Sequence, residues 1–331
     1  LLFGTAYQVF PQIGMHGGRG LMRVLSANVI TPTDLYVSSN FSSYFEKVGP
    51  EQLAKYYAMN LNATYGLTNN LELSLNFIPY QDDQKHIFGR MGNSQFAIKY
   101  KMPFSGRYFQ LGVLGFFKLP TAQENNVPYE VFYTKHSAWG SRMLFSFNLS
   151  KIVPQSLLKL HVNLGYYDHN INDTYFSSKI DQMLMGIGFV VPIRSSQIYL
   201  EYSGELFINN QDTVSFSENS NRITTGIKFL GPYKTLIDVA ADIGLSKRSK
   251  LAEISVFHKD YPRWRVWVGI AYRFSFYKYF DKSAKLARQK EEQERRKLER
   301  IKQRRRKATI EMQKMKEILK RKNKEKENNS E

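Results

Sequence analysis

The chain has 331 residues, no cysteine, and 47 Lys and Arg against 29 Asp and Glu, for a formal net charge of +18. Without cysteine, a disulfide framework and a thiolate metal site are excluded. No stretch approaches the 18 apolar residues of a transmembrane helix, and the mean hydropathy is −0.43. Transmembrane β-strands escape this test, because only every second residue of such a strand faces lipid.

The first 34 residues do not show one clear pattern. Gly14, Gly17, Gly18 and Gly20 form a flexible run before Leu21–Ile30. We treat 1–34 as a separate segment with three alternatives: a periplasmic element, a plug inside a barrel, or an extra pair of strands at Phe3–Phe10 and Leu21–Ile30.

Residues 35–276 repeat a unit of about ten residues in which apolar and polar side chains alternate. The segment Leu71–Phe77, for example, reads Leu-Glu-Leu-Ser-Leu-Asn-Phe. This period of two predicts β-strands and is incompatible with a helix. The predicted strands are 36–45, 59–65, 71–77, 95–102, 109–119, 141–149, 158–166, 183–192, 198–208, 222–229, 237–245 and 264–274.

The connections between these strands alternate in length. Short turns are predicted at 68–70, 105–107, 151–156, 194–196 and 231–235, and long loops at 47–57, 81–92, 121–136, 169–180, 209–220 and 246–262. Short turns on one side and long loops on the other are typical of bacterial outer-membrane barrels, whereas a soluble β-sandwich shares only the local alternation. We therefore predict an all-β, transmembrane antiparallel β-barrel of about 12 strands, or 14 if the N-terminal strand pair forms.

Several segments resemble bacterial outer-membrane β-barrels of the OmpA-like and related superfamily. The closing segment 264–276 resembles the aromatic terminal strand that the barrel assembly machinery recognises, with Trp264, Trp267, Tyr272, Phe274 and Phe276. Tyr65–Glu72 and Leu119–Thr121 are similar to hairpin and loop-entry sequences of the same proteins. The resemblance implies outer-membrane lipid and the assembly machinery as partners. In the superfamily, the closing strand usually ends the protein or precedes a globular peptidoglycan-binding domain. This sequence departs from the superfamily because neither follows residue 276.

The alternation places charged side chains on the face that points into the barrel. Across three consecutive strands we expect a ladder of complementary charges. The ladder consists of Glu201, Glu205, Arg222, Lys228, Asp238 and Asp242. Further lumen charges are expected at Lys99, Lys101, Lys118, Arg142 and Lys159. These charges either close the lumen as a structural ladder or select solutes in a narrow polar pore.

No catalytic, metal or cofactor site is predicted. The six histidines stand in no recognisable arrangement with a serine and an acid, and no histidine pair has ligand spacing on one element. The phosphate-binding pattern GxxxxGK[ST] does not occur. We therefore expect a non-enzymatic protein.

Residues 277–331 form a basic tail with 21 Lys and Arg against 10 Asp and Glu. Its Glu, Lys, Arg, Gln and Ala content predicts a periplasmic helix with a disordered end, and its spaced apolar residues permit a coiled coil. Arg304, Arg305, Arg306 and Lys307 supply the densest charge. Peptidoglycan or a periplasmic protein is the expected partner, and nucleic acid is not.

The leading hypothesis from the sequence is an outer-membrane barrel whose periplasmic helix anchors to, or recruits, an envelope partner. The alternative is a narrow, porin-like channel for small hydrophilic solutes.

Overall fold

A computed structural model describes residues 13–47, 53–82, 89–104, 106, 108–122, 136–149, 157–173, 178–193, 195–209, 215–232, 235–247, 262–276 and 293. The chain divides into two compact units, Val9–Phe276 and Leu1–Gln8 with Tyr277–Glu331. The fold described below is that of the first unit. In the described part of the chain, no helix is both long and apolar enough to cross a membrane.

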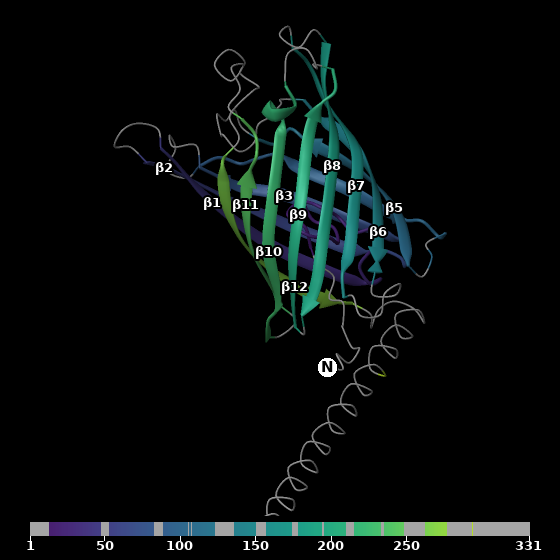
Figure 1. Ribbon diagram of the computed structural model, residues 1–331. Helices are drawn as coiled ribbons and strands as arrows, with labels where there is room; N and C mark the ends of the chain where they lie inside the picture. The colour runs from purple at the N-terminus through teal and green to yellow at the C-terminus, as the bar shows by residue number, and fades with distance from the viewer. Residues whose placement is uncertain are drawn as a thin grey trace, which may run out of the picture. The chain divides into compact units, whose positions relative to one another are not determined.

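Twelve described strands form a closed antiparallel barrel (Figure 1). They are β1 (Asp34–Lys47), β2 (Leu53–Gly66), β3 (Leu71–Gln81), β4 (Ser94–Lys101), β5 (Phe109–Leu119), β6 (Ala138–Asn148), β7 (Lys159–Asp173), β8 (Ser178–Ile193), β9 (Ser196–Phe207), β10 (Ser220–Leu230), β11 (Thr235–Gly244) and β12 (Trp264–Ser275). Each strand pairs with its neighbours in the chain, and β12 pairs with β1. The prediction of a twelve-stranded barrel is confirmed. The alternative of fourteen strands is wrong, because the pairing of β1 with β12 closes the ring.

The alternation in the sequence becomes an inner and an outer face of the barrel wall. On β12, exposed Val266, Val268 and Ile270 alternate with buried Arg265 and Trp267. Large apolar side chains are exposed in the same way on the other strands, including Leu75 on β3, which is 55% exposed. A continuous apolar outer surface of this kind is favourable in lipid and costly in water.

Two predicted long loops are wrong in their boundaries. Residues predicted as the loop 169–180 belong largely to β7 and β8, which run to Asp173 and begin again at Ser178. Likewise β2 begins at Leu53, inside the predicted loop 47–57. Polar composition suggested loops there, but the hydrogen-bonded pairing of β7 with β8 continues past a register shift between Asp168 and Asn172. Strand pairing thus extends beyond the apolar part of the wall.

The two ends of the barrel can be told apart. We call the end that holds Asp34, its partner Ser275 and the turn at 67–70 the turn end, and the opposite one the loop end. At the turn end, Asp34 accepts hydrogen bonds from Arg273 at 2.9 Å and from Ser275 at 2.6 Å. These contacts join the first and last strands.

Residues 13–33 occupy the space enclosed by the strands, and we call them the lumen segment. They form only isolated bridges, Ile13 with Arg19 and Gly20 with Leu25, so the predicted strand at Leu21–Ile30 is wrong. The segment contributes Leu21 and Val24 to one cluster of buried apolar side chains, which also contains Val190 and Tyr199 of the wall. The core of this barrel is therefore built from the wall and the lumen segment together.

The apolar outer face leads to a prediction about the stability of the barrel when a charged side chain is placed in the lipid. We expect Leu75→Arg, on the lipid-facing side of β3, to destabilise the protein in vesicles by about 2–4 kcal/mol, because arginine near the middle of a bilayer loses its hydration. Leu67→Arg, also exposed but at the turn end, is the matched control, with an expected cost of about 0–1 kcal/mol. Urea unfolding in lipid vesicles, followed by tryptophan fluorescence, measures both. Equal costs for the two variants would contradict a lipid-facing surface at Leu75.

Candidate functional site

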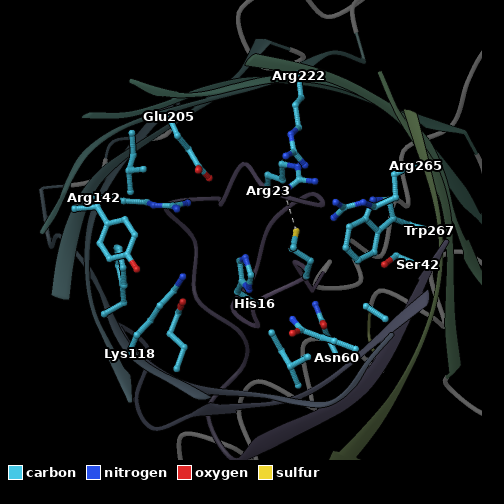
Figure 2. Close-up of a pocket in the computed structure, with 18 of the residues that line it drawn as sticks. His16, Arg23, Ser42, Asn60, Lys118, Arg142, Glu205, Arg222, Arg265 and Trp267 are labelled. Carbon is cyan, nitrogen blue, oxygen red and sulfur yellow. Dashed lines mark hydrogen bonds between the residues drawn. The ribbon is translucent and has the colours of Figure 1, made fainter. Parts of the chain in front are cut away.

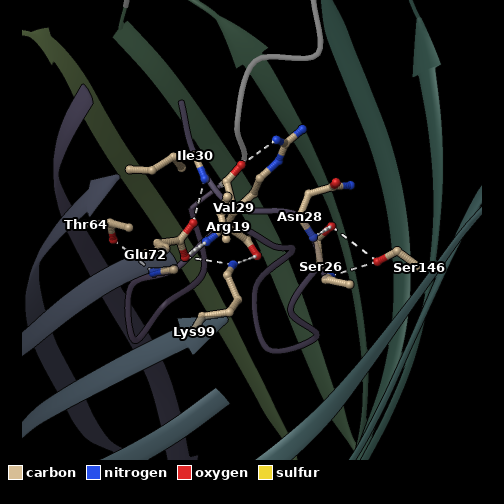
Figure 3. Close-up of polar contacts among 11 residues, drawn as sticks. Arg19, Ser26, Asn28, Val29, Ile30, Thr64, Glu72, Lys99 and Ser146 are labelled. Carbon is tan, nitrogen blue, oxygen red and sulfur yellow. Dashed lines mark hydrogen bonds and ion pairs between the residues drawn. The ribbon is translucent and has the colours of Figure 1, made fainter. Parts of the chain in front are cut away.

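The carboxylate of Glu72 on β3 holds one side of the lumen segment (Figure 3). It accepts hydrogen bonds from the backbone N–H groups of Arg19, at 2.9 Å, and Ile30, at 2.8 Å. It also forms an ion pair with Lys99 of β4 at 2.7 Å, and both side chains are only 1% exposed. Lys99 in turn donates to the backbone carbonyl of Arg19 at 3.1 Å. A buried charge is tolerated when it is paired and hydrogen-bonded in this way.

A second carboxylate, that of Glu201 on β9, holds the other side of the segment. It accepts hydrogen bonds from the backbone N–H groups of Arg23, at 2.8 Å, and Val24, at 3.1 Å. The Arg23 guanidinium pairs with Asp242 of β11, which also accepts hydrogen bonds from Thr224 at 2.7 Å and Trp267 at 2.9 Å. In the ring of twelve strands, β3 and β9 lie six strands apart. The two glutamates therefore reach the segment from opposite walls.

Further polar contacts join the segment to the wall between these two points. Ser146 accepts a hydrogen bond from the backbone N–H of Ala27 at 2.9 Å, and its hydroxyl lies 3.3 Å from that of Ser26. Lys228 of β10 donates to the backbone carbonyl of Ile13 at 2.9 Å. Irregular backbone buried inside a barrel needs such partners, because its N–H and C=O groups have no neighbouring strand.

Small wall residues make the space that the segment fills. A Cβ atom added at Gly188 would lie 2.5 Å from Leu21, and one added at Gly186 would lie 2.9 Å from Val24. At Gly112, an added Cβ would lie 3.2 Å from the backbone of Ala27. The wall is thus shaped to the segment and does not fill the lumen with its own side chains.

A chamber of about 120 Å³ remains in the loop-end half of the lumen (Figure 2). Arg142, Arg222 and Arg265 point into it from different strands, and His16 and Arg23 of the lumen segment lie near its centre. Phe116, Tyr167 and Trp267 supply aromatic walls. Lys118 adds a further cation and Glu205 a carboxylate. The chamber is therefore both basic and aromatic.

His16 does not add a charge to this chamber at neutral pH. Loss of contact with water lowers the pKa of its imidazole well below the ordinary value, and the nearby cations Lys118, Arg142 and Arg23 lower it further. Each of these effects disfavours the imidazolium form.

The six predicted ladder residues fall into three pairs. Lys228 and Asp238 face each other across β10 and β11 and form an ion pair at 3.0 Å. Glu201 and Asp242 lie on either side of Thr224 and bind the lumen segment, and Arg222 and Glu205 line the chamber. The alternation placed these side chains on the inner face but gave no sign of a second chain segment as their partner.

The other predicted lumen charges divide in the same way. Lys99 binds Glu72 and the lumen segment, whereas Lys118 and Arg142 line the chamber. Lys101 and Lys159 belong to β4 and β7 at the turn end.

On the closing strand, Trp264, Tyr272, Phe274 and Phe276 are exposed on the outer surface, but Trp267 is buried and faces Asp242. The sequence contained a signal for this direction, because Trp267 is two residues from Arg265 and so shares its face.

Two parts of the sequence prediction lie outside the described residues: the strand at Phe3–Phe10 and the basic tail. The basic tail with Arg304, Arg305, Arg306 and Lys307 lies outside the described residues, so its helix, its coiled coil and its binding of peptidoglycan or a periplasmic protein stay predictions. Among the residues that the structure describes, no group of three or more His, Asp or Glu side chains is arranged to hold a metal ion.

Comparison with solved structures identifies the architecture. The barrel is similar to the NanC porin, with a TM-score of 0.51 over 71% of this chain and 98% of the porin. This chain has an outer-membrane β-barrel fold. It is also similar to the KdgM porin (TM-score 0.46, 72% of this chain and 99% of the porin) and to an outer-membrane channel from Pseudomonas putida F1 (TM-score 0.46, 75% and 98%).

Sequence identity to these three proteins is 8%, 8% and 12%, so the similarity concerns the fold. No protein-family model and no curated protein matches the sequence.

The hydrogen bonds that Glu201 accepts from the lumen segment lead to a prediction about the exchange of the segment's amides. In Glu201→Gln, the amide offers one acceptor oxygen to two backbone donors and places an NH₂ group against them. We expect amide hydrogen exchange at Arg23 and Val24 to become at least about tenfold faster, because hydrogen bonds to a charged acceptor contribute about 1.5–3 kcal/mol each. Mass spectrometry of the refolded protein measures the exchange. Glu205→Gln, the same change four residues further along β9, is the control and should leave the exchange of these amides unchanged.

Proposed function

We propose that this chain is an outer-membrane channel for small hydrophilic solutes, and that the lumen segment closes it until displaced. The observation that carries the proposal is the way in which the lumen is filled. A structural barrel fills its interior with large side chains from its own strands. Here Gly112, Gly186 and Gly188 leave room, and residues 13–33 occupy it.

The polar lining of the lumen supports this function. On β1 and β2 the inner face consists largely of small polar side chains, which would face water once the segment moved away. They are Ser38, Asn40, Ser42, Asn60, Asn62 and Thr64. On the outer face, the exposed apolar side chains fit the outer membrane as the location.

The segment is held by apolar packing of Leu21 and Val24 and by polar contacts, and water can replace each polar contact when the segment leaves. Four backbone N–H groups donate to Glu72 and Glu201, and Lys228 and Ser146 supply further bonds. A hydrogen bond to a charged acceptor contributes about 1.5–3 kcal/mol, and one between neutral groups about 0.5–1.5 kcal/mol. None of these bonds belongs to the pairing between strands, so displacement of the segment leaves the pairing of the barrel wall in place.

Conductance tests the proposal in a chain with no natural cysteine. In planar bilayers, we expect Glu201→Gln to raise the open fraction of full-length protein by about tenfold or more, because it weakens the hold on the segment. We expect the pair Ser26→Cys and Ser146→Cys, introduced into that variant, to form a disulfide, since the two hydroxyls lie 3.3 Å apart. The oxidised protein should pass no current, and reduction should restore it.

Ser146→Cys alone is the control for the engineered disulfide and should not respond to oxidation. Silence of both Glu201→Gln and the reduced double-cysteine protein would contradict a channel. Equal current in the oxidised and reduced forms would show that the lumen segment does not close it.

A further inference from the structure

Five cationic side chains surround the chamber at the loop end of the lumen. Arg23 comes from the lumen segment, and the four others come from separate strands around the barrel (Figure 2). These four are Lys118 on β5, Arg142 on β6, Arg222 on β10 and Arg265 on β12. The cluster is therefore a product of the closed barrel and not of one stretch of sequence.

Three described carboxylates lie near these cations. Asp242 pairs with Arg23, Glu205 lines the chamber, and Glu201 lies beside Arg23 with its oxygens bound to two backbone N–H groups. Five cations and three carboxylates thus meet in one confined space. Like charges gathered in a confined space repel one another, and the repulsion is greater where little water screens it.

The aromatic walls hold the cations in place around the open space. The Arg142 guanidinium lies 5.6 Å from the ring centre of Phe116, and the Lys118 ammonium 5.0 Å from that of Tyr167. Arg265 lies 5.2 Å from the ring of Trp267. Rings at these distances stabilise a cation without removing its charge.

Donor capacity is also left over in the chamber. The Nε atom of Arg142 is buried and has no hydrogen-bond partner among the described residues. A buried donor without a partner costs free energy, and an acceptor atom entering the chamber would remove that cost.

We infer that this chamber is a binding site for a small oxyanion, whose negative charge is carried by carboxylate or phosphate groups, and that this anion occupies the chamber on its way through the barrel. Guanidinium groups bind both kinds of oxyanion through paired hydrogen bonds. The role as a transported solute rests on the proposed channel function, whereas binding itself does not.

Isothermal titration calorimetry measures binding to the chamber and does not require the protein to conduct ions. Full-length protein is refolded in an uncharged detergent at low ionic strength, so that salt does not screen the charges. The probes are citrate, inorganic phosphate and the neutral sugar glucose. We expect saturable binding of citrate, phosphate or both, and none of glucose. Binding of citrate alone assigns the site to carboxylates, and binding of phosphate alone assigns it to phosphate groups. Failure of both anions to bind, or equal binding of glucose, would overturn the inference.

Matched variants locate the site. Arg142→Gln should raise the dissociation constant of the anion that binds by about tenfold or more, because it removes a charge-assisted contact. Arg142→Lys, which keeps the charge, should recover part of the affinity. Lys101→Gln removes one positive charge at the turn end and should bind like the unchanged protein. Equal weakening by Lys101→Gln would show attraction to net charge alone and overturn the inference.

Thermal unfolding of each variant in the same detergent confirms that the barrel is folded. Binding by a protein that never conducts would keep the anion site and reject the channel. Conduction without anion binding would support the channel and reject the anion site.

Discussion

Two carboxylates that bind backbone N–H groups from opposite walls define the interior of this barrel. Glu72 and Glu201 each accept two such hydrogen bonds from a segment that has no regular secondary structure. Irregular backbone inside a barrel must find acceptors for its N–H groups, and a carboxylate with two oxygens serves two donors at once. Because the glutamates project from β3 and β9, six strands apart, they fix the segment across the whole width of the lumen.

Because of this arrangement, the two halves of the lumen differ in how tightly they are packed. The turn-end half is packed with Leu21, Val24 and Ala27 of the segment, and the loop-end half keeps a chamber of about 120 Å³. Arg23 links the two halves, since its backbone N–H binds Glu201 and its side chain lies in the chamber. Displacement of the segment would therefore also remove one cation from the chamber, which couples opening to the charge that a solute meets.

Much of the barrel could be predicted from the sequence, because every strand has apolar residues on its lipid-facing side. In the sequence, these residues recur at every second position. The closing strand shows this well: the face of Arg265 and Arg273 follows from spacing alone. The boundaries of β2, β7 and β8 could not be predicted, since hydrogen-bonded pairing continues through polar residues such as Asp168. The partner of Glu201 could not be predicted either, because Arg23 is 178 residues distant in the chain and its acceptor is decided by the closed ring.

The glycines in the wall have a consequence for how this sequence can change over evolution. A Cβ atom added at Gly188 would clash with the Leu21 side chain, and one added at Gly186 would clash with the Val24 side chain. A larger residue at either wall position requires the facing side chain of the segment to shift or to become smaller. Among descendants of this chain, positions 21 and 188, and positions 24 and 186, should therefore vary as pairs, and a lineage that lost the segment would be free to replace both glycines.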